Sequence, residues 1–120
     1  MAHREIADAA EQWMRTHGHV SHDQIDCSHF VTAVLQASVA PGFPYHTADA
    51  LLTSGLFTRV DQPARGDLVH WPGHVAIILD PIAGTFIGSQ SSTGVDVANY
   101  KYGPYWARRA NRVFLRYDGR

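Results

Sequence analysis

The chain of 120 residues is poor in several features that would each place it in a particular class of protein. It has one cysteine, so no disulfide can form within it, and Cys27 must be a buried hydrophobe, a metal ligand or a reactive thiol. Its formal net charge is only −1, so no basic surface points to nucleic acid or anionic lipid as a partner. No apolar run approaches the ~18 residues of a membrane-spanning helix, so no membrane span is expected.

The sequence also lacks internal repeats, low-complexity tracts and any stretch that reads as an interdomain linker. A chain of this length can bury most of its apolar surface, so we expect one domain over residues 1–120. The first residues, "MAHREIADAAEQW", lack the long apolar core of a secretory signal, and we expect no signal peptide.

Hydrophobic periodicity predicts helices in the first half of the chain and strands in the second. Apolar residues at helical spacing predict helices over 3–17 and 27–40, and a short third helix in "TADALLTSG", with Thr47 as its cap and Gly55 beyond its end. Five later segments are expected to be strands: "GDLVHW", "HVAIILD", "GTFIGSQ", "GVDVANY" and "NRVFLRY". Helices followed by a mostly antiparallel sheet of about five strands indicate the α+β class.

Cys27 lies where a polar loop meets the second predicted helix. The first turn of a helix offers unpaired N–H groups and the positive end of the helix dipole. Such a position can lower the pKa of a thiol from ~8.5 to roughly 3.5–7.5, which suits a nucleophile. The same N–H groups could hold the oxyanion that forms when sulfur attacks a carbonyl. The alternative is a small buried residue on the core side of the helix.

A cysteine nucleophile needs a base that removes its proton and later protonates the leaving amine. His74 opens the predicted strand 74–80, at the rim of the sheet, where the end of a helix can meet it. Taken alone, His74 could be an ordinary turn histidine. His70 is the other candidate, although it lies within a strand and could equally be a packed side chain. His29 would point roughly 200° away from Cys27 around the helix, which makes it a poor partner.

A third group usually orients such an imidazole by accepting its other N–H. Gln90 ends the strand that should pair beside residues 74–80, and its amide oxygen could accept this hydrogen. Ser89 or a backbone carbonyl could do the same. Gln90 could also be a solvated glutamine at the end of a strand.

Two further groups of side chains admit two interpretations each. The aromatic rings near residue 106 could wall a groove and stack on substrate, or they could cover the edge of the sheet. These rings are Tyr100, Tyr102, Tyr105 and Trp106. Three histidines, His17, His19 and His22, lie close together but match no usual zinc spacing, so we expect loop and surface histidines and no metal site.

Two segments together resemble the NlpC-like family of papain-fold cysteine peptidases and amidases, which act on bacterial cell-wall peptides. "DCSHFV" resembles the family's nucleophile signature "DCSGF", with His29 where glycine is common. "RGDLVHWPGHVAIILD" is similar to the segment "GDLVFF…GHVGIYLG", which carries the catalytic histidine. Both segments occur in the family's order, and the resemblance covers residues 26–94.

The resemblance implies a papain-like fold and a metal-independent cysteine amidase without a cofactor. Cys27 would be the nucleophile and His74 the base. The substrate would be a peptidoglycan stem peptide, cut next to γ-D-glutamate. Asp26 and Ser28 flank the nucleophile, and the family's equivalent aspartate tends to recognise a free amino group. From the residues alone, Asp26 is a helix-capping carboxylate, and the two roles can coexist.

The chain departs from the family pattern at two places. The family's third catalytic residue is commonly a histidine that aligns with Gly88, so Gln90, two residues on and on the same face, is the candidate in its place. The upstream "YxWGG" stretch that helps to form the substrate groove is replaced by "THGHVSHDQI". Trp106 is a further candidate for contact with substrate.

The chain is also similar to short single-domain amidase effectors of type VI secretion systems and to phage lytic enzymes. That similarity implies a protein made in the bacterial cytoplasm, delivered to the periplasm of a target cell and neutralised by an immunity protein in its producer. Alternatives with the same fold are an acyltransferase or deamidase that acts on a protein or lipid, and a binding module without activity. A metal-binding regulator that uses the histidine cluster is a fourth hypothesis.

Overall fold

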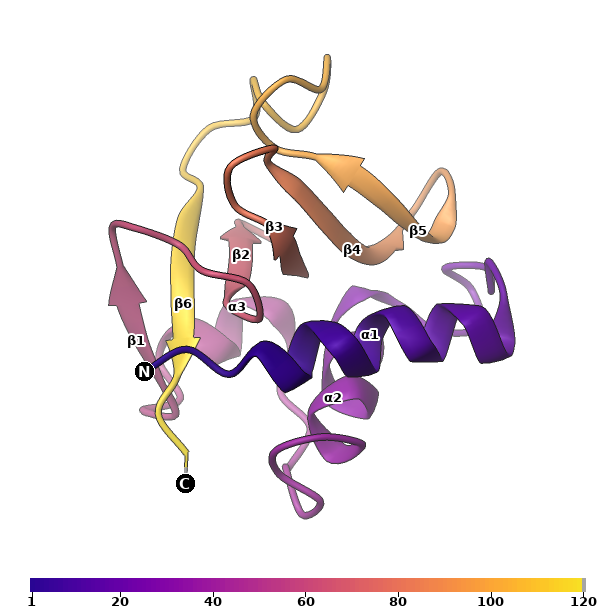
Figure 1. Cartoon of the computed structure of the whole chain (residues 1–120). Helices are drawn as coiled ribbons and strands as arrows, with labels where there is room; N and C mark the ends of the chain where they lie inside the picture. Colours follow the sequence, from indigo (N-terminus) through magenta and orange to yellow (C-terminus); the bar gives the residue numbers. More distant parts are fainter. Residues whose placement is uncertain (120) are drawn as a thin grey trace.

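The computed structural model describes residues 1–119 and has helices packed on an antiparallel sheet (Figure 1). The helices are α1 (Arg4–His17), α2 (Cys27–Gln36) and α3 (Ala48–Leu52). The strands are β1 (Phe57–Val60), β2 (Leu68–Trp71), β3 (His74–Asp80), β4 (Thr85–Gln90), β5 (Gly94–Asn99) and β6 (Val113–Tyr117). The α+β class expected from the sequence is confirmed, and this layered arrangement is consistent with a papain-like fold.

The ends of the helices follow from local capping. In α2 the side chain of Asp26 accepts the backbone N–H of His29, and in α3 Thr47 does the same for Ala50. α2 is four residues shorter than predicted, because the chain turns after Gln36. The N–H of Ala40 then donates to the carbonyl of Leu35 at 3.0 Å, which closes the helix before Pro41 is reached.

The sheet has six strands in the order β1-β6-β2-β3-β4-β5, and every neighbouring pair is antiparallel. The sequence predicted five of them and missed β1. This strand is four residues long, and only Phe57 in it is buried, so it has no clear alternation. It forms because it pairs with β6, with Phe57 opposite Tyr117, a contact between residues far apart in the chain.

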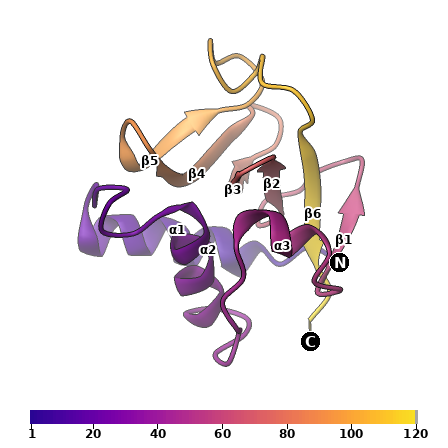
Figure 2. The ribbon, with the colours of Figure 1, turned by 180° about the vertical axis from the view of Figure 1, so that it is seen from behind.

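The two faces of the sheet are covered by different parts of the chain. Val75, Ile77 and Leu79 of β3 face the helices and share a core with α1 and α2. Ala76 and Ile78 face the other way, where the segment that follows β5 covers them. Figures 1 and 2 show α1 and α2 on the same side of the sheet in both views. Among residues 1–119, no helix has the length and apolar character needed to cross a bilayer.

The loop before α2 is hydrogen-bonded to β4 and β5. The N–H of Val95 donates to the carbonyl of Val20 at 2.9 Å, and the ring of His19 contacts the carbonyl of Val95 at 2.8 Å. The hydroxyl of Ser89 in β4 donates to the carbonyl of Ile25 at 2.5 Å. These bonds place the loop that leads into α2 beside the end of β4 and the start of β5.

Candidate active site

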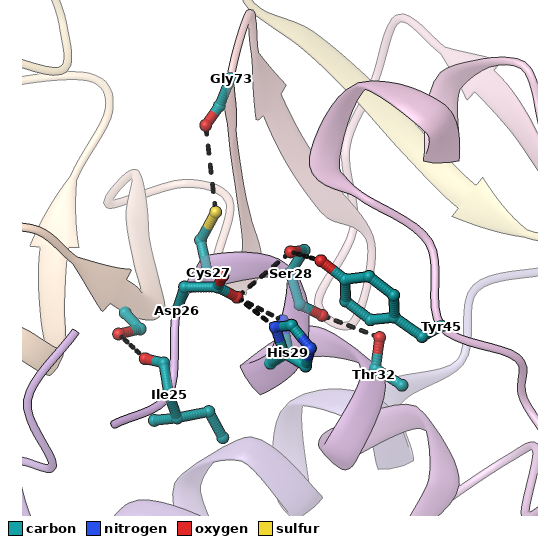
Figure 3. A network of polar contacts seen from close by, with 9 residues as sticks. Ile25, Asp26, Cys27, Ser28, His29, Thr32, Tyr45 and Gly73 are labelled. Atoms are coloured by element: carbon teal, nitrogen blue, oxygen red, sulfur yellow. Dashed lines mark hydrogen bonds and ion pairs between the residues drawn. The ribbon is translucent and has the colours of Figure 1, made fainter. Parts of the chain in front are cut away.

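Cys27 is the first residue of α2 and lies against the turn between β2 and β3. Its side chain is 7% exposed, and its Sγ lies 4.0 Å from the carbonyl oxygen of Gly73 (Figure 3). The backbone N–H of Val75 also interacts with the sulfur. The sulfur therefore contacts the backbone on both sides of His74. Cys27 and the first residues of β3 are thus neighbours in the structure, although they are distant in the sequence.

The burial of Cys27 raises the pKa of its thiol, and the charge of Asp26 raises it further. The N–H groups of Val75, Ser28 and Cys27 itself act in the opposite direction but are outweighed. The sequence-based expectation of a lowered thiol pKa at a helix start is therefore wrong for this protein. The position of Cys27 at the start of a helix does not indicate how deeply its sulfur is buried.

Asp26 is confirmed as the N-cap of α2 (Figure 3). Its Oδ1 accepts hydrogen bonds from the backbone N–H of His29 at 2.9 Å and from the hydroxyl of Ser28 at 3.2 Å, and it contacts Nδ1 of His29 at 2.8 Å. Partial burial raises the pKa of Asp26, but the interactions with His29 and Ser28 outweigh it and lower the pKa overall. Asp26 is therefore a carboxylate at neutral pH.

His74 is the first residue of β3, and it is 6% exposed. Its ring stacks on that of Trp106, with the centroids 4.5 Å apart and an interplanar angle of 24°. Burial lowers the pKa of His74 to about 4, helped by the positive charge of Arg109, while Gln90 acts against this lowering. The imidazole is therefore uncharged at neutral pH and able to accept a proton.

Gln90 is the last residue of β4 and is buried on the same face of the sheet as Gly88. Its Nε2 donates to the carbonyl of Asp96 at 3.3 Å, and this hydrogen bond fixes the orientation of the side-chain amide. Its Oε1 is buried without a hydrogen-bond partner among the described residues, and the same is true of Nε2 of His74. The two groups interact without the geometry of a full hydrogen bond, and their donor and acceptor characters are complementary.

Gly88, which aligns with the third histidine of the NlpC-like pattern, has no room for a side chain. A Cβ atom there would lie 2.7 Å from Cβ of Ala76 and 2.7 Å from Oε1 of Gln90. Gln90 thus fills the space next to this position. Ser89, the alternative orienting residue, points to the opposite face and donates to Ile25, so its hydroxyl is committed there.

One cavity, of about 300 Å³, lies beside Cys27. It is lined by His22, Asp26, Cys27, Ser28, Tyr45, Thr47, Ala48, Asp49 and Gly73. Ser28 is 5% exposed, and its hydroxyl is 2.8 Å from that of Tyr45, whose ring stacks on His29. Two carboxylates, Asp26 and Asp49, make this cavity acidic.

A second cavity, of about 650 Å³, lies beside His74. It is lined by His22, Gly73, His74, Gln90, Ser91, Ser92, Tyr105, Trp106 and Arg109. Since His22 and Gly73 line both cavities, the two adjoin each other at the turn between β2 and β3. Six residues proposed from the sequence as catalytic or substrate-binding thus line this double cavity: Asp26, Cys27, Ser28, His74, Gln90 and Trp106.

The other histidines have different surroundings. His70 is 1% exposed, and its Nε2 is 3.1 Å from Oδ1 of Asp49, so it is a packed residue held by a carboxylate. Burial lowers the pKa of His70. His29 is exposed and turned towards Asp26. Across residues 1–119, no three His, Cys, Asp or Glu side chains form a group that could hold a metal ion.

Sequence reasoning missed Asp49, Tyr45 and Arg109. Asp49 accepts the N–H of Gly73 at 2.8 Å as well as facing His70, so it holds the turn that presents His74. Nothing in its local sequence marks this role. Arg109 belongs to a basic pair directly after the aromatic segment, which was a weak signal for a cation close to those rings.

The rings of the aromatic segment divide between the sheet and the wall of a cavity. Tyr100 is 2% exposed and packs on the sheet face formed by Val69, Ile78 and neighbouring residues. Tyr105 is exposed and lines the cavity beside His74 together with Trp106.

Comparison with known proteins agrees with this arrangement. A search of curated proteins gave no match. The family model described as NlpC/P60 family matches residues 14–114, which covers most of the chain and both segments that form the double cavity. Members of that family are cysteine peptidases, and the match suggests a peptidoglycan-hydrolysing enzyme. The fold and the position of Cys27 at the start of α2 agree with this match, and the chain belongs to the NlpC/P60 family.

Proposed function

We propose that the protein is a cysteine amidase that hydrolyses an amide bond in peptidoglycan stem peptides, next to γ-D-glutamate. The observation that carries the proposal is the position of the one sulfur. Cys27 opens α2 and contacts the backbone on both sides of His74, whose buried imidazole is uncharged at neutral pH. A nucleophile beside a proton acceptor is the minimal apparatus for acyl transfer through a thioester.

The reaction starts from a neutral pair, because the pKa of the thiol is raised and that of the imidazole is lowered. Sγ of Cys27 attacks the amide carbonyl carbon while its proton passes to His74. The carbonyl oxygen becomes an oxyanion, which N–H groups at the start of α2 stabilise. The C–N bond then breaks, and His74 gives its proton to the leaving amine. Water, deprotonated by His74, hydrolyses the thioester and restores the thiol.

Gln90 orients the imidazole in this scheme. When His74 carries the proton, its Nε2–H faces the amide oxygen of Gln90, which has no other partner among residues 1–119. A neutral amide stabilises an imidazolium less than a carboxylate would, which agrees with the low pKa of His74. Trp106 limits the rotation of the ring by stacking on it.

The acidic cavity beside Cys27 would recognise a free amino group of the stem peptide. Within residues 1–119, the hydrogen bonds to Asp26 all reach Oδ1, so Oδ2 can accept from an ammonium group. The hydroxyl groups of Ser28 and Tyr45 lie next to it and can complete the contacts.

The test is digestion of purified sacculi with the wild-type protein and with Cys27→Ala. Wild type should release soluble muropeptides, and mass spectrometry should show a new carboxyl group at γ-D-glutamate. Cys27→Ala should release none while its far-UV circular dichroism and melting temperature stay close to wild type. Release by Cys27→Ala at the wild-type rate would exclude the mechanism.

We extend the proposal to an injected antibacterial role, on the resemblance of the sequence to short single-domain effector amidases. Such a protein would act in the periplasm of a target cell and would have an immunity protein as partner. Expression in a Gram-negative host with an added export signal should then cause lysis, whereas cytoplasmic expression should not. Equal growth of both strains would count against this role.

A further inference from the structure

Arg109 is held in a fixed position at the cavity beside His74. Its Nη2 donates to the carbonyl of Pro72 at 2.6 Å, and its guanidinium carbon lies 5.3 Å from the centre of the Trp106 ring. Trp106 in turn stacks on His74, so one indole contacts both the cation and the imidazole. The contacts occupy one N–H group and one face of the guanidinium of Arg109. Its other N–H groups can therefore donate hydrogen bonds to a ligand.

Arg109 has no carboxylate partner within residues 1–119, in contrast to the two arginines that form ion pairs. Arg65 pairs with Asp8 and Glu11, and Arg116 pairs with Asp67. A half-buried cation without a counter-charge, at the wall of a cavity of about 650 Å³, is a site that attracts an anion. Ser91 and Ser92, in the turn after β4, add hydroxyl groups to the same wall.

The two cavities therefore differ in charge. The one beside Cys27 contains the carboxylates of Asp26 and Asp49, and the one beside His74 contains Arg109. In the proposed reaction, the acyl part of the substrate becomes bonded to Cys27, and the amine leaves from the side of His74, which protonates it. The leaving part must therefore occupy the cavity that Arg109 lines.

We propose that Arg109, supported by Trp106, binds a carboxylate carried by the leaving-amine part of the substrate. The inference rests on the proposed function and adds a requirement for the residue that follows γ-D-glutamate. A guanidinium with donors to spare suits a carboxylate, which accepts two N–H groups side by side. An amidated substrate would lose this interaction and would leave Arg109 without a counter-charge.

The experiment uses the tripeptide L-alanyl-γ-D-glutamyl-meso-diaminopimelate in three forms. In one both carboxylates of the last residue are free, and in the others either the α-carboxyl or the side-chain carboxyl is a carboxamide. Wild type should cleave one amide form with kcat/KM lower by roughly ten- to a hundred-fold, the range for a hydrogen bond to a charged group. The form that is affected identifies which carboxylate is bound.

Arg109→Gln should lower kcat/KM for the free tripeptide by a similar factor and should no longer distinguish the three forms. Arg109→Lys should keep part of the discrimination because the charge remains. Arg108→Gln is the matched control: Arg108 is the exposed neighbour in the same segment, and this variant should behave as wild type. Since Arg109 also affects the pKa of His74, rates are compared on the plateau of each pH profile.

Calorimetry with Cys27→Ala separates this inference from the function on which it rests. Tighter binding of the free tripeptide than of the amide forms, lost in Cys27→Ala/Arg109→Gln, supports the carboxylate site even if no form is cleaved. Cleavage by wild type at equal rates for all three forms would overturn the inference and leave the amidase proposal standing. Equal binding of all forms to Cys27→Ala would overturn it as well.

Discussion

Acidification should destabilise the protein through His74. In the folded protein burial lowers the pKa of His74 to about 4 from the usual histidine value of 6.5. As the pH falls below 6.5, the unfolded chain binds a proton that the folded protein still excludes from its interior. The contribution of His74 to stability is thus complete above pH 6.5 and is lost progressively as the pH falls towards 4.

The magnitude follows from the size of the shift. At ~1.4 kcal/mol for each unit of pKa, a lowering from 6.5 to about 4 corresponds to about 3 kcal/mol between the two ends of this range. Because the side chain is 6% exposed, screening by solvent reduces this value little. For a small protein, this is a large part of the free energy of unfolding.

The assay is urea unfolding at pH 7.5 and pH 4 of wild type and of His74→Phe, which keeps an aromatic ring against Trp106 but cannot titrate. Wild type should lose about 3 kcal/mol more than the variant, since other groups, such as His70, contribute to both. The ring signals of His74 in NMR spectra should give the folded pKa directly. A measured value at or above 6.5, or an equal loss of stability in both proteins, would refute the reasoning.

Two more predictions concern the neighbours of the proposed catalytic pair. Gly88→Ala should cost roughly 1–3 kcal/mol in urea unfolding by overpacking, because its Cβ would lie 2.7 Å from Oε1 of Gln90, whereas Gly42→Ala, with nothing within 4 Å, should be close to neutral. Equal stabilities would show that the sheet face has room to adjust. Asp26→Asn keeps a capping side chain but removes a charge that raises the pKa of Cys27, so the midpoint of alkylation by iodoacetamide against pH should fall. An unchanged midpoint would mean that burial alone sets this pKa.

Local signals in the sequence were sufficient for most of the fold and for the placement of the candidate residues. Apolar spacing and capping residues gave the helices, and Asp26 marked the start of α2 at Cys27. Alternation gave five of the six strands and placed His74 at the start of β3 and Gln90 at the end of β4. The same alternation put Gln90 on the face of Gly88, because strand geometry repeats every two residues.

Other properties depend on contacts between residues that are distant in the chain, so no local pattern could reveal them. β1 exists because β6 pairs with it. The start of α2 lies at the β2–β3 turn because α2 and β3 share one hydrophobic core. The raised pKa of Cys27 and the lowered pKa of His74 are both consequences of burial, which opposes charge wherever water is excluded. The position of Arg109 on Trp106 is of the same kind, since a basic residue in a loop acquires a function only through the surface that the fold places beside it.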